Sequence, residues 1–589
     1  MNFSKKFKNI SLHTKEWFAS LGVLGQLGVV IALGFSVIIS SSLLIGSIEN
    51  AYLVFIDPPA LPVMKDKGIK LYFSFLLMLF GMVITSFNIS ILSAALEKTF
   101  RDIKKGHLKY YGENHTLIIN YNRKVMKILQ EINLFHEKNK DMHEVIIFIN
   151  NEKDIEILQS KIKKYHFNNL KVFIRFGDTF LYSRYKELGI YDIYALIILS
   201  EESIKDPFLR DNNNLRIMNL LFSNDKFSNY LYEKKKNMKQ VKAVVEFSDI
   251  HHFDTIVKEA TQSLFLALSP TNVLSSILNL SMININFYNM WSQLLSFNGY
   301  ELYFVDSKRY KLTDTAYKDA LLRHKHGLLI GISRVEDGEF KLLLNAKEEI
   351  IKEDDWLIFI SEDIHGISFL DEVHEYKATQ VIAPPKEVFT RNVAIIGNQR
   401  DIKTNNLLDT ESSHVANINY DNIELFQKSS YDKLLIPSQK QEIKYDTIII
   451  NHNDEMIYRI ALYLKVLYSD QSIEKFVFIV DDTLIAEQLI NAGFKNTILS
   501  HLLISNYMAQ VSNQLALHEV FNILLTGTGA QLNFIDTDNV PQNIQELKYE
   551  LIYNKMLYLG LIMNDGRVEF ESTNIQNAKK IIVLSDAKE

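Results

Sequence analysis

Two long stretches without a formal charge constrain this chain more than any other feature. Residues 17–48 are 32 positions without Asp, Glu, Lys or Arg, and residues 71–96 are 26 more. A helix needs ~20 apolar residues to cross the hydrocarbon core of a bilayer, so each stretch is long enough to span it. A cleaved signal peptide has an apolar core of only ~7–15 residues, which the first stretch exceeds. The sequence therefore predicts two membrane-spanning helices, at about 21–46 and 71–96.

Charge divides the chain into two parts. Residues 1–110 carry 12 Lys/Arg and 6 Asp/Glu, net +6, and the other 479 residues carry 52 and 64, net −12. Four lysines precede the first span and five basic residues follow the second, against three between the spans. The positive-inside rule then places both termini in the cytoplasm. The acidic remainder argues against a nucleic-acid partner, and the absence of cysteine excludes thiolate metal sites and cysteine nucleophiles.

The connection 47–70 has the pattern of a re-entrant pore loop. Ser47 can cap a short helix, and Pro58 and Pro59 must end it. Asp57 stands where this helix ends, and a ring of such carboxylates, one from each subunit, would attract cations. The alternative is an extracellular loop with an apolar helix on the membrane surface. The predicted filter residues are Glu49, Ile56, Asp57 and Pro58.

The second span is rich in small and polar residues. Gly81, Thr85 and Asn88 share one helical face, which we predict to line the pore. Close packing between helices is the alternative reading of the same residues. A short basic helix at 97–105 follows and leads to Gly112.

From residue 113 onward, short apolar strands alternate with amphipathic helices. Strands are predicted at 116–119, 144–149, 171–174, 195–199 and 241–246, with helices such as 125–135 and 155–164 between them. This alternation implies α/β architecture, a parallel sheet with right-handed crossovers of the Rossmann-like kind. The pattern recurs after Pro384 and Pro385, with strands at 393–396, 447–450 and 476–480.

Each Rossmann-like unit is followed by a small α+β module. In the first module the predicted strands are 300–305, 326–332 and 356–361, and in the second they are 560–563 and 581–584. The predicted division of the chain is an N-terminus at 1–20, a transmembrane pore domain at 21–96, a linker at 97–112, a first Rossmann-like domain at 113–284, its module at 285–385, a second Rossmann-like domain at 386–520 and its module at 521–589.

Neither Rossmann-like unit carries the glycine fingerprint that lets a backbone approach a pyrophosphate. Residues 120–125 of the first unit read Asn-Tyr-Asn-Arg-Lys-Val, and the second unit keeps only Gly397. Dinucleotide binding, and with it a membrane-anchored dinucleotide-dependent enzyme, is therefore disfavoured. We predict no catalytic residue and no required cofactor.

Carboxylates follow several predicted strands. Asp178, Glu246 and Asp249 could together bind calcium or another cation, which would be a regulatory ion. The alternative is that these acidic residues are solvated at the edge of the sheet.

Several motifs resemble the RCK domains that regulate ion conductance. Residues 176–179 (Phe-Gly-Asp-Thr) and 185–190 (Tyr-Lys-Glu-Leu-Gly-Ile) are similar to the Gly-Asp turn and helix end of an RCK domain. Residues 343–345 and 350–357 are similar to the module that follows it. More narrowly, residues 113–118 (Glu-Asn-His-Thr-Leu-Ile) and 244–249 (Val-Val-Glu-Phe-Ser-Asp) resemble the CASTOR/POLLUX family of ion channels.

This resemblance implies a ligand-gated cation channel, a homotetramer in membrane lipid that passes monovalent or divalent cations and is gated by a cytoplasmic ring. The chain departs from the plant members, which have further spans ahead of the pore pair, and we expect a prokaryotic plasma membrane. Pro58 and Pro59 also replace the small residues behind the aspartate of the family's filter. The alternative function, from another class, is a membrane-anchored ligand sensor or partner-binding protein without conduction.

Overall fold

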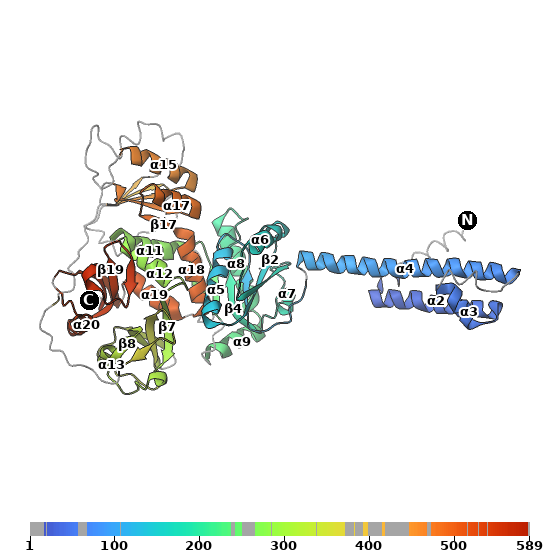
Figure 1. Cartoon of the computed structure of the whole chain (residues 1–589), viewed down its shortest axis with the longest axis horizontal. Helices are drawn as coiled ribbons and strands as arrows, with labels where there is room; N and C mark the ends of the chain where they lie inside the picture. Colours follow the sequence, from blue (N-terminus) through green and yellow to red (C-terminus); the bar gives the residue numbers. More distant parts are fainter. Residues whose placement is uncertain are drawn as a thin grey trace. The chain divides into compact units, whose positions relative to one another are not determined.

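A computed structural model of the chain forms two compact units, Met1–Leu108 and Lys109–Glu589. Figure 1 shows the elements of both units with their labels. The residues that the structure describes are 17–18, 20–56, 68–106, 108–236, 242–249, 265–283, 285–336, 339–370, 382, 393–397, 415–418, 447–467, 473–514, 516–527, 529–538 and 540–586.

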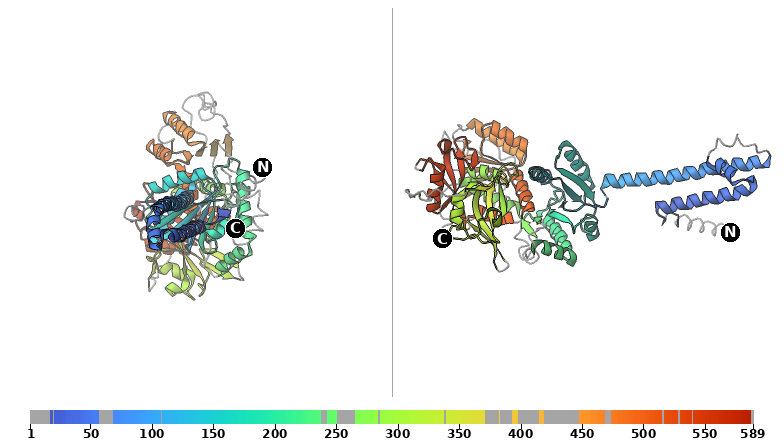
Figure 2. Two further views of the ribbon diagram at one scale, coloured as in Figure 1. Left: turned by 90° about the vertical axis from the view of Figure 1, so that its right-hand side faces the viewer. Right: turned by 60° about the horizontal axis from the view of Figure 1, so that its bottom comes forward.

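The first unit consists of two long apolar helices and a short one between them. Helices α2 (Val23–Ile45) and α4 (Ile69–Lys105) are each long and apolar enough to cross a membrane, and α3 (Ile48–Ile56) lies beside both (Figures 1 and 2). The 37 residues of α4 extend ~55 Å at 1.5 Å per residue, well beyond the ~30 Å of a hydrocarbon core. The predicted second span and the predicted basic helix at 97–105 are thus parts of one continuous helix.

The second unit begins with a six-stranded parallel sheet of order β3-β2-β1-β4-β5-β6. Its strands are β1 (His115–Ile119), β2 (His143–Ile149), β3 (Leu170–Phe176), β4 (Ile193–Ile198), β5 (Lys242–Glu246) and β6 (Leu266–Leu268). All five predicted strands are confirmed, and β6 was not predicted. Buried side chains of β1 alternate between two cores, with Ile118 in one and Leu117 and Ile119 in the other.

Helices cover both faces of this sheet. The Ile118 core includes α5 (Lys124–Asn139) and α6 (Glu152–Lys164), whereas the opposite core includes α7 (Tyr182–Glu187), α8 (Pro207–Phe222) and α9 (Asp225–Lys236). A sheet covered on both faces explains why its strands are continuous apolar runs rather than alternating ones.

The second parallel sheet has the order β14-β13-β15-β16-β17. Its strands are β13 (Val393–Gly397), β14 (Val415–Ile418), β15 (Thr447–Asn451), β16 (Phe476–Val480) and β17 (Thr497–Leu499), with helices α15 (Asp454–Leu467) and α17 (Thr483–Asn491). The three predicted strands are confirmed, and β14 and β17 were not predicted.

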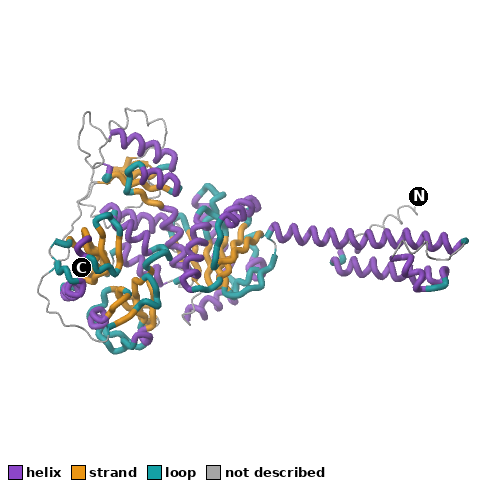
Figure 3. Tube along the Cα trace, viewed as in Figure 1, coloured by secondary structure: helices purple, strands orange, loops and turns teal. Residues whose placement is uncertain are grey.

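Two antiparallel four-stranded modules complete the unit, and Figure 3 shows the sheets as separate orange groups. The first has the order β10-β9-β11-β7, and the second has the order β18-β21-β19-β20. Their elements are β7 (Glu301–Asp306), η3 (Ser307–Tyr310), α13 (Tyr317–Arg323), β8 (His324–His326), β9 (Leu328–Glu336), β10 (Glu339–Leu344), β11 (Trp356–Ser361), β12 (Ser368–Phe369), β18 (Ala530–Asp536), α20 (Ile544–Tyr553), β19 (Met556–Met563), β20 (Val568–Phe570), η6 (Ile575–Asn577) and β21 (Ala578–Asp586). The predicted duplication is thus present in the structure.

Helix α18 (Ser500–Asn513) ties the duplicated halves together. It is buried along nearly its whole length and packs on α5, β4 and β5 of the first half as well as on β16 of the second. Helices α11 (Pro270–Ile283), α12 (Asn286–Leu294) and α19 (Ala516–Thr526) complete this helical layer (Figure 1). The predicted domain boundary after residue 520 lies within α19.

Candidate functional site

The short helix α3 reaches the middle of the membrane unit. The backbone N–H of Asn50 donates to Ser47 Oγ at 3.3 Å, which is the cap predicted from the sequence. Ala51, Val54 and Phe55 are buried on one face of α3, at the i, i+3, i+4 spacing of a packed helix. This face packs against α2 and α4 in one small apolar core.

The end of α3 packs against two glycines, one in each long helix. A Cβ built on Gly34 would lie 3.3 Å from Phe55 Cζ, and one built on Gly81 would overlap the backbone carbonyl oxygen of Phe55. Gly34 is the central residue of α2, ~16 Å from either end of that helix. The chain therefore leaves the end of α2 and runs back as α3 to mid-depth beside both long helices. This half of the connection packs among the long helices, as the first half of a re-entrant loop would.

The predicted pore residues take different positions. Gly81 is buried and covered by α3 of its own chain, which agrees with the close packing that the sequence left open as the alternative. Thr85 is exposed and Asn88 is half-buried in the single chain. Glu49 and Ile56 are exposed on α3, whereas Asp57 and Pro58 lie outside the described residues.

The start of the second unit is fixed to its first sheet. The N–H of Tyr110 donates to the carbonyl of Glu187 at 2.8 Å, and its hydroxyl donates to Glu144 at 2.6 Å. The Asn114 N–H donates to the carbonyl of Asp192 at 2.6 Å. The segment that follows α4 in sequence is therefore anchored to β2 and to the ends of α7 and β4.

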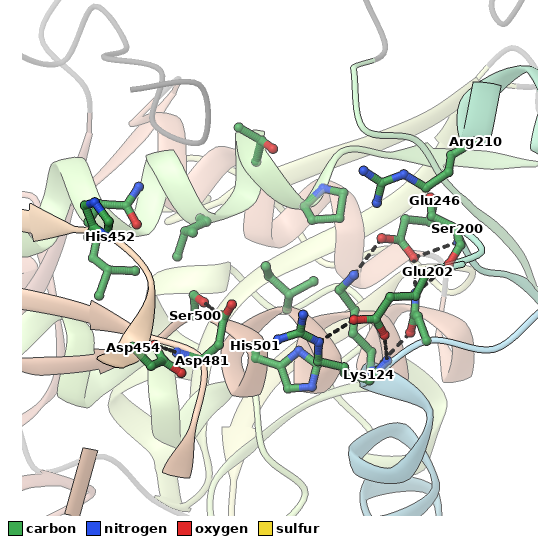
Figure 4. Close-up of a pocket in the computed structure, with 18 residues that line it drawn as sticks. Lys124, Ser200, Glu202, Arg210, Glu246, His452, Asp454, Asp481, Ser500 and His501 are labelled. Atoms are coloured by element: carbon green, nitrogen blue, oxygen red, sulfur yellow. Dashed lines mark hydrogen bonds and ion pairs between the residues drawn. The ribbon is translucent and has the colours of Figure 1, made fainter. Parts of the chain in front are cut away.

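A cleft of about 330 Å³ lies between the carboxyl ends of the two parallel sheets (Figure 4). On one side it is lined by the turn after β1, by Ser200 after β4 and by Glu246 at the end of β5. On the other side the lining comes from the ends of β15 and β16 and the first residues of α18. Carboxyl ends of parallel strands are where ligands bind in open α/β sheets, especially between strands whose crossovers diverge, as those of β1 and β4 do.

The turn after β1 begins with a residue in the left-handed conformation. Asn120 has φ 68°, a left-handed conformation that asparagine tolerates better than most residues. Its side-chain amide donates to the carbonyl of Leu199 at 2.9 Å and to Asn214 Oδ1 at 3.3 Å. Amide side chains thus fill the space beside the turn, as expected from a turn that lacks the glycine fingerprint.

Glu246 is the centre of the hydrogen-bond network on the first side of the cleft. Its Oε1 lies 2.6 Å from Lys124 Nζ, and its Oε2 accepts from Asn122 Nδ2 and the Ser200 N–H, each at 3.1 Å. Nearby, the Arg123 side chain and backbone N–H both donate to Glu202. These pairs neutralise two cations and two carboxylates within the cleft wall.

The second side of the cleft is acidic, and its carboxylates also accept hydrogen bonds from within the chain. Asp454 accepts from the N–H groups of Asp481 and Asp482 at 3.0 and 2.7 Å, and Ser500 Oγ donates to Asp481. Burial lowers the pKa of His501, and the nearby Lys124 ammonium lowers it further. His501 therefore lines the cleft as a neutral imidazole at neutral pH.

The three carboxylates predicted to bind one cation do not form one site. Asp178 follows β3, which β2, β1 and β4 separate from β5, so ~19 Å of sheet lies between Asp178 and Glu246. Glu246 is paired with Lys124, and the backbone N–H of Asp249 donates to Asp211 Oδ2 at 3.0 Å. Within the described part of the chain, no group of three His, Asp or Glu residues could hold a metal ion. The prediction of this shared site is wrong, and regulatory calcium stays a prediction without an assigned site.

Sequence reasoning missed the residues of α8 that hold the cleft edge in place. Asp211 accepts from the N–H of Ser248 at 2.7 Å, and Asn214 Nδ2 donates to the carbonyl of Glu246 at 2.7 Å. Both side chains are buried. The sequence feature that could have identified them is a pair of polar residues at i and i+3 on the apolar face of a helix. Burying such side chains costs free energy unless they are hydrogen-bonded, so the pair indicates buried partners.

Comparisons with known proteins agree with this architecture. Residues 272–377 match the family model described as Castor and Pollux, part of voltage-gated ion channel. The probable ion channel POLLUX of Arabidopsis thaliana is 22% identical over 327 residues, 55% of this chain and 37% of that protein. The ion channel CASTOR of Lotus japonicus is 22% identical over 285 residues, 48% of this chain and 31% of that protein. The matched region thus spans less than two-fifths of each relative.

Among solved structures, the human SLO3 gating ring aligns with 81% of this chain and 100% of its own, with a TM-score of 0.52 and 10% sequence identity. The fold is therefore that of a tandem RCK gating-ring subunit joined to two apolar helices, which makes the chain a membrane protein. The particular resemblance predicted from residues 113–118 and 244–249, to the CASTOR and POLLUX ion channels, is confirmed.

Proposed function

We propose that the chain is one subunit of a homotetrameric, ligand-gated cation channel whose cytoplasmic unit forms the gating ring. The observation that carries this proposal is the end of α3 at the mid-depth of α2, in contact with Gly34 and Gly81. Irregular backbone at such depth is tolerated only where it is buried in protein or lines water. A pore satisfies that condition for the segment that follows α3.

The electrostatics of α3 favour a cation. The carboxyl end of a helix carries a partial negative charge, and Asp57 follows the last residue of α3 directly. Four copies of this arrangement around one axis would attract cations and repel anions. The exposed face of α3, with Tyr52, Leu53 and Ile56, provides an apolar surface for neighbouring subunits.

Gating would act through α4. This helix is unbroken from the predicted span to Lys105, and the residues after it are anchored to the first sheet through Tyr110 and Asn114. A ligand that prefers one shape of the ring would shift the open fraction by its differential affinity for the two shapes. We further propose a multi-pass protein of a prokaryotic plasma membrane with both termini in the cytoplasm, passing monovalent or divalent cations and performing no catalysis.

Bi-ionic reversal potentials of the reconstituted protein test the filter. Asp57→Asn should reduce the preference for cations over anions, because it removes one carboxylate per subunit from the proposed ring. Asp66→Asn, in the same loop, is the matched control and should leave selectivity near that of the wild type. Unchanged selectivity in Asp57→Asn would overturn the filter role.

A membrane-anchored ligand sensor without conduction is the second candidate, and the cleft between the two sheets favours it equally. A purified tetramer that stays electrically silent under varied calcium, nucleotide and voltage would support the sensor over the channel.

A further inference from the structure

Tyr110 stands at the start of the second unit, close in sequence to the end of α4. Lys105 is the last residue of α4, so the chain between the two is five residues long. Five residues extend over at most ~18 Å, which makes this tether short. The way in which Tyr110 is held therefore decides how much of a movement in the first sheet reaches α4.

The contacts of Tyr110 come from one helix and three strands of the first Rossmann-like domain. Its N–H donates to the carbonyl of Glu187 at the end of α7, and its hydroxyl donates to Glu144 of β2. Its ring lies against the rings of His115 in β1 and Phe173 in β3, with centroids 4.5 and 5.9 Å away. We call these contacts together the clasp.

The chain turns back over the Tyr110 ring at Gly112. A Cβ built on Gly112 would lie 2.1 Å from the hydroxyl oxygen of Tyr110 and 2.4 Å from its Cζ, closer than non-bonded atoms approach. Glycine at this position is therefore required for the hydroxyl to reach Glu144. Tyr111, which lies between the two, is 90% exposed, so two adjacent tyrosines differ in environment and only the first is held.

The hydrogen bond between Tyr110 and Glu144 is of the strong kind. Its acceptor is a carboxylate, and such charge-assisted hydrogen bonds are roughly twice as strong as neutral ones. Burial and the Glu144 carboxylate raise the pKa of Tyr110, so the phenol keeps the proton that it donates. Lys171 lies farther from Glu144, at 3.6 Å, and is exposed.

A second set of contacts fixes the neighbouring Lys109. Its Nζ lies 3.6 Å from the Glu187 carboxylate, which also pairs with Arg184. Arg184 Nη2 in turn donates at 2.8 Å to the carbonyl of Phe176, the last residue of β3. The Lys109 ammonium is exposed, and exposed ion pairs contribute little, so Tyr110 provides the main attachment.

We propose that Tyr110, through its clasp on Glu144, is the positioning residue that transmits movements of the first sheet to α4 and so sets the open fraction. This deepens the proposed function and rests on it, since without a pore the clasp only orders the connection. When the clasp is lost, α4 takes its own preferred position whatever the shape of the ring, because the two shapes no longer differ in how they hold it.

Bilayer recording of the purified full-length protein tests the role of the clasp. Tyr110→Phe keeps the ring and removes the donor, and it should change the ratio of open to closed time about tenfold, the effect of one charge-assisted hydrogen bond. Its unitary conductance should stay that of the wild type. The matched control, Tyr111→Phe, removes the same atom at the adjacent exposed position and should leave both quantities unchanged.

Two further variants separate positioning from general stabilisation. Gly112→Ala should reproduce the effect of Tyr110→Phe, because its Cβ displaces the hydroxyl without altering Tyr110 itself. Glu144→Gln keeps an acceptor and should change the open-to-closed ratio only severalfold. Combined with Tyr110→Phe it should add nothing, since both changes act on one contact, whereas additive effects would overturn the clasp.

The clasp is also overturned if Tyr110→Phe, or Glu144→Gln where the other variants fail to fold, opens as the wild type does. Hydrogen exchange at the Tyr110 amide measures the attachment without conduction, and it should be about tenfold faster in Tyr110→Phe than in Tyr111→Phe. Faster exchange in a protein that passes no current would refute the channel and retain the attachment. Unchanged exchange would refute the clasp, whether or not the protein conducts.

Discussion

Acidification should loosen the first sheet through His115, the first residue of β1. This side chain is fully buried against the ring of Tyr110, with ring centroids 4.5 Å apart. Burial lowers the pKa of His115 from 6.5 to about 4, although the Leu188 backbone and the carboxylates of Asp192 and Glu144 oppose the shift. The substitution that tests this effect is His115→Phe, which keeps a planar ring and removes the titration.

The direction and size of this change in stability follow from the pKa of His115 in the folded and in the unfolded state. Unfolded His115 gains a proton below pH ~6.5, but folded His115 stays neutral down to pH ~4, so the unfolded state binds more protons between these values. The stability contributed by the neutral imidazole is complete above pH 6.5 and is lost as the pH falls toward 4. At 1.36 kcal/mol per pKa unit, the loss between pH 7 and pH 5 is about 2 kcal/mol, or about thirtyfold in the opening equilibrium.

Hydrogen exchange of the β1 backbone amides at pH 7 and pH 5, corrected with an unstructured reference, measures that equilibrium. We expect wild-type protection to fall about thirtyfold more than that of His115→Phe over this range. His166→Phe, at an exposed position, is the control and should behave like the wild type. If protection in wild type and His115→Phe falls by the same factor, the reasoning from burial of His115 is refuted.

Two further predictions concern packing and a buried ion pair. Asp355→Asn should destabilise the first module by about 2–3 kcal/mol, because buried Arg334 would lose the carboxylate that it holds at 2.8 and 3.0 Å and keep that of the more exposed Glu349, at 2.9 Å. Asp354→Asn, at an exposed position, is the control, and urea unfolding that fails to separate the two variants would contradict the argument. Gly81→Ala should displace α3 and abolish tetramer assembly or conduction, because its Cβ would overlap a backbone carbonyl of α3. The control is Gly28→Ala in α2, whose Cβ would meet no atom within 4 Å and which should be tolerated. Light scattering measures assembly, and bilayer recording measures conduction.

The elements that depend on local pattern could be predicted well. Both spans, the Ser47 cap and all eight strands predicted in the two Rossmann-like units are present, because apolar length, capping residues and strand runs act over a few neighbouring residues. The strands that were missed, such as β6, β14 and β17, have only three or four residues, too few for a period to show.

The candidate site was predicted only in part. The sequence showed that residues 120–125 lack the glycine fingerprint, but it could not show that Asn120 would take the left-handed conformation and donate to Leu199 and Asn214. Arg210 of the cleft lining lies 86 residues after Lys124 and 290 before Ser500 in the sequence, and nothing local to it distinguishes it from a solvated arginine.

The sequence by itself determined the secondary structure and fold class of each part. These are two apolar spans with a proline-terminated helix between them, then two copies of a parallel α/β unit with an antiparallel module. These follow from hydrophobicity and its period, which need no knowledge of distant residues. Only the tertiary structure decided that α3 packs against Gly81, that Glu246 pairs with Lys124, and that the carboxyl ends of both sheets share one cleft. Each of these contacts joins residues that are far apart in the sequence and become neighbours only when the whole unit packs. In such a buried place an unpaired charge or an extra methyl group is costly, so packing decides which residues can lie together.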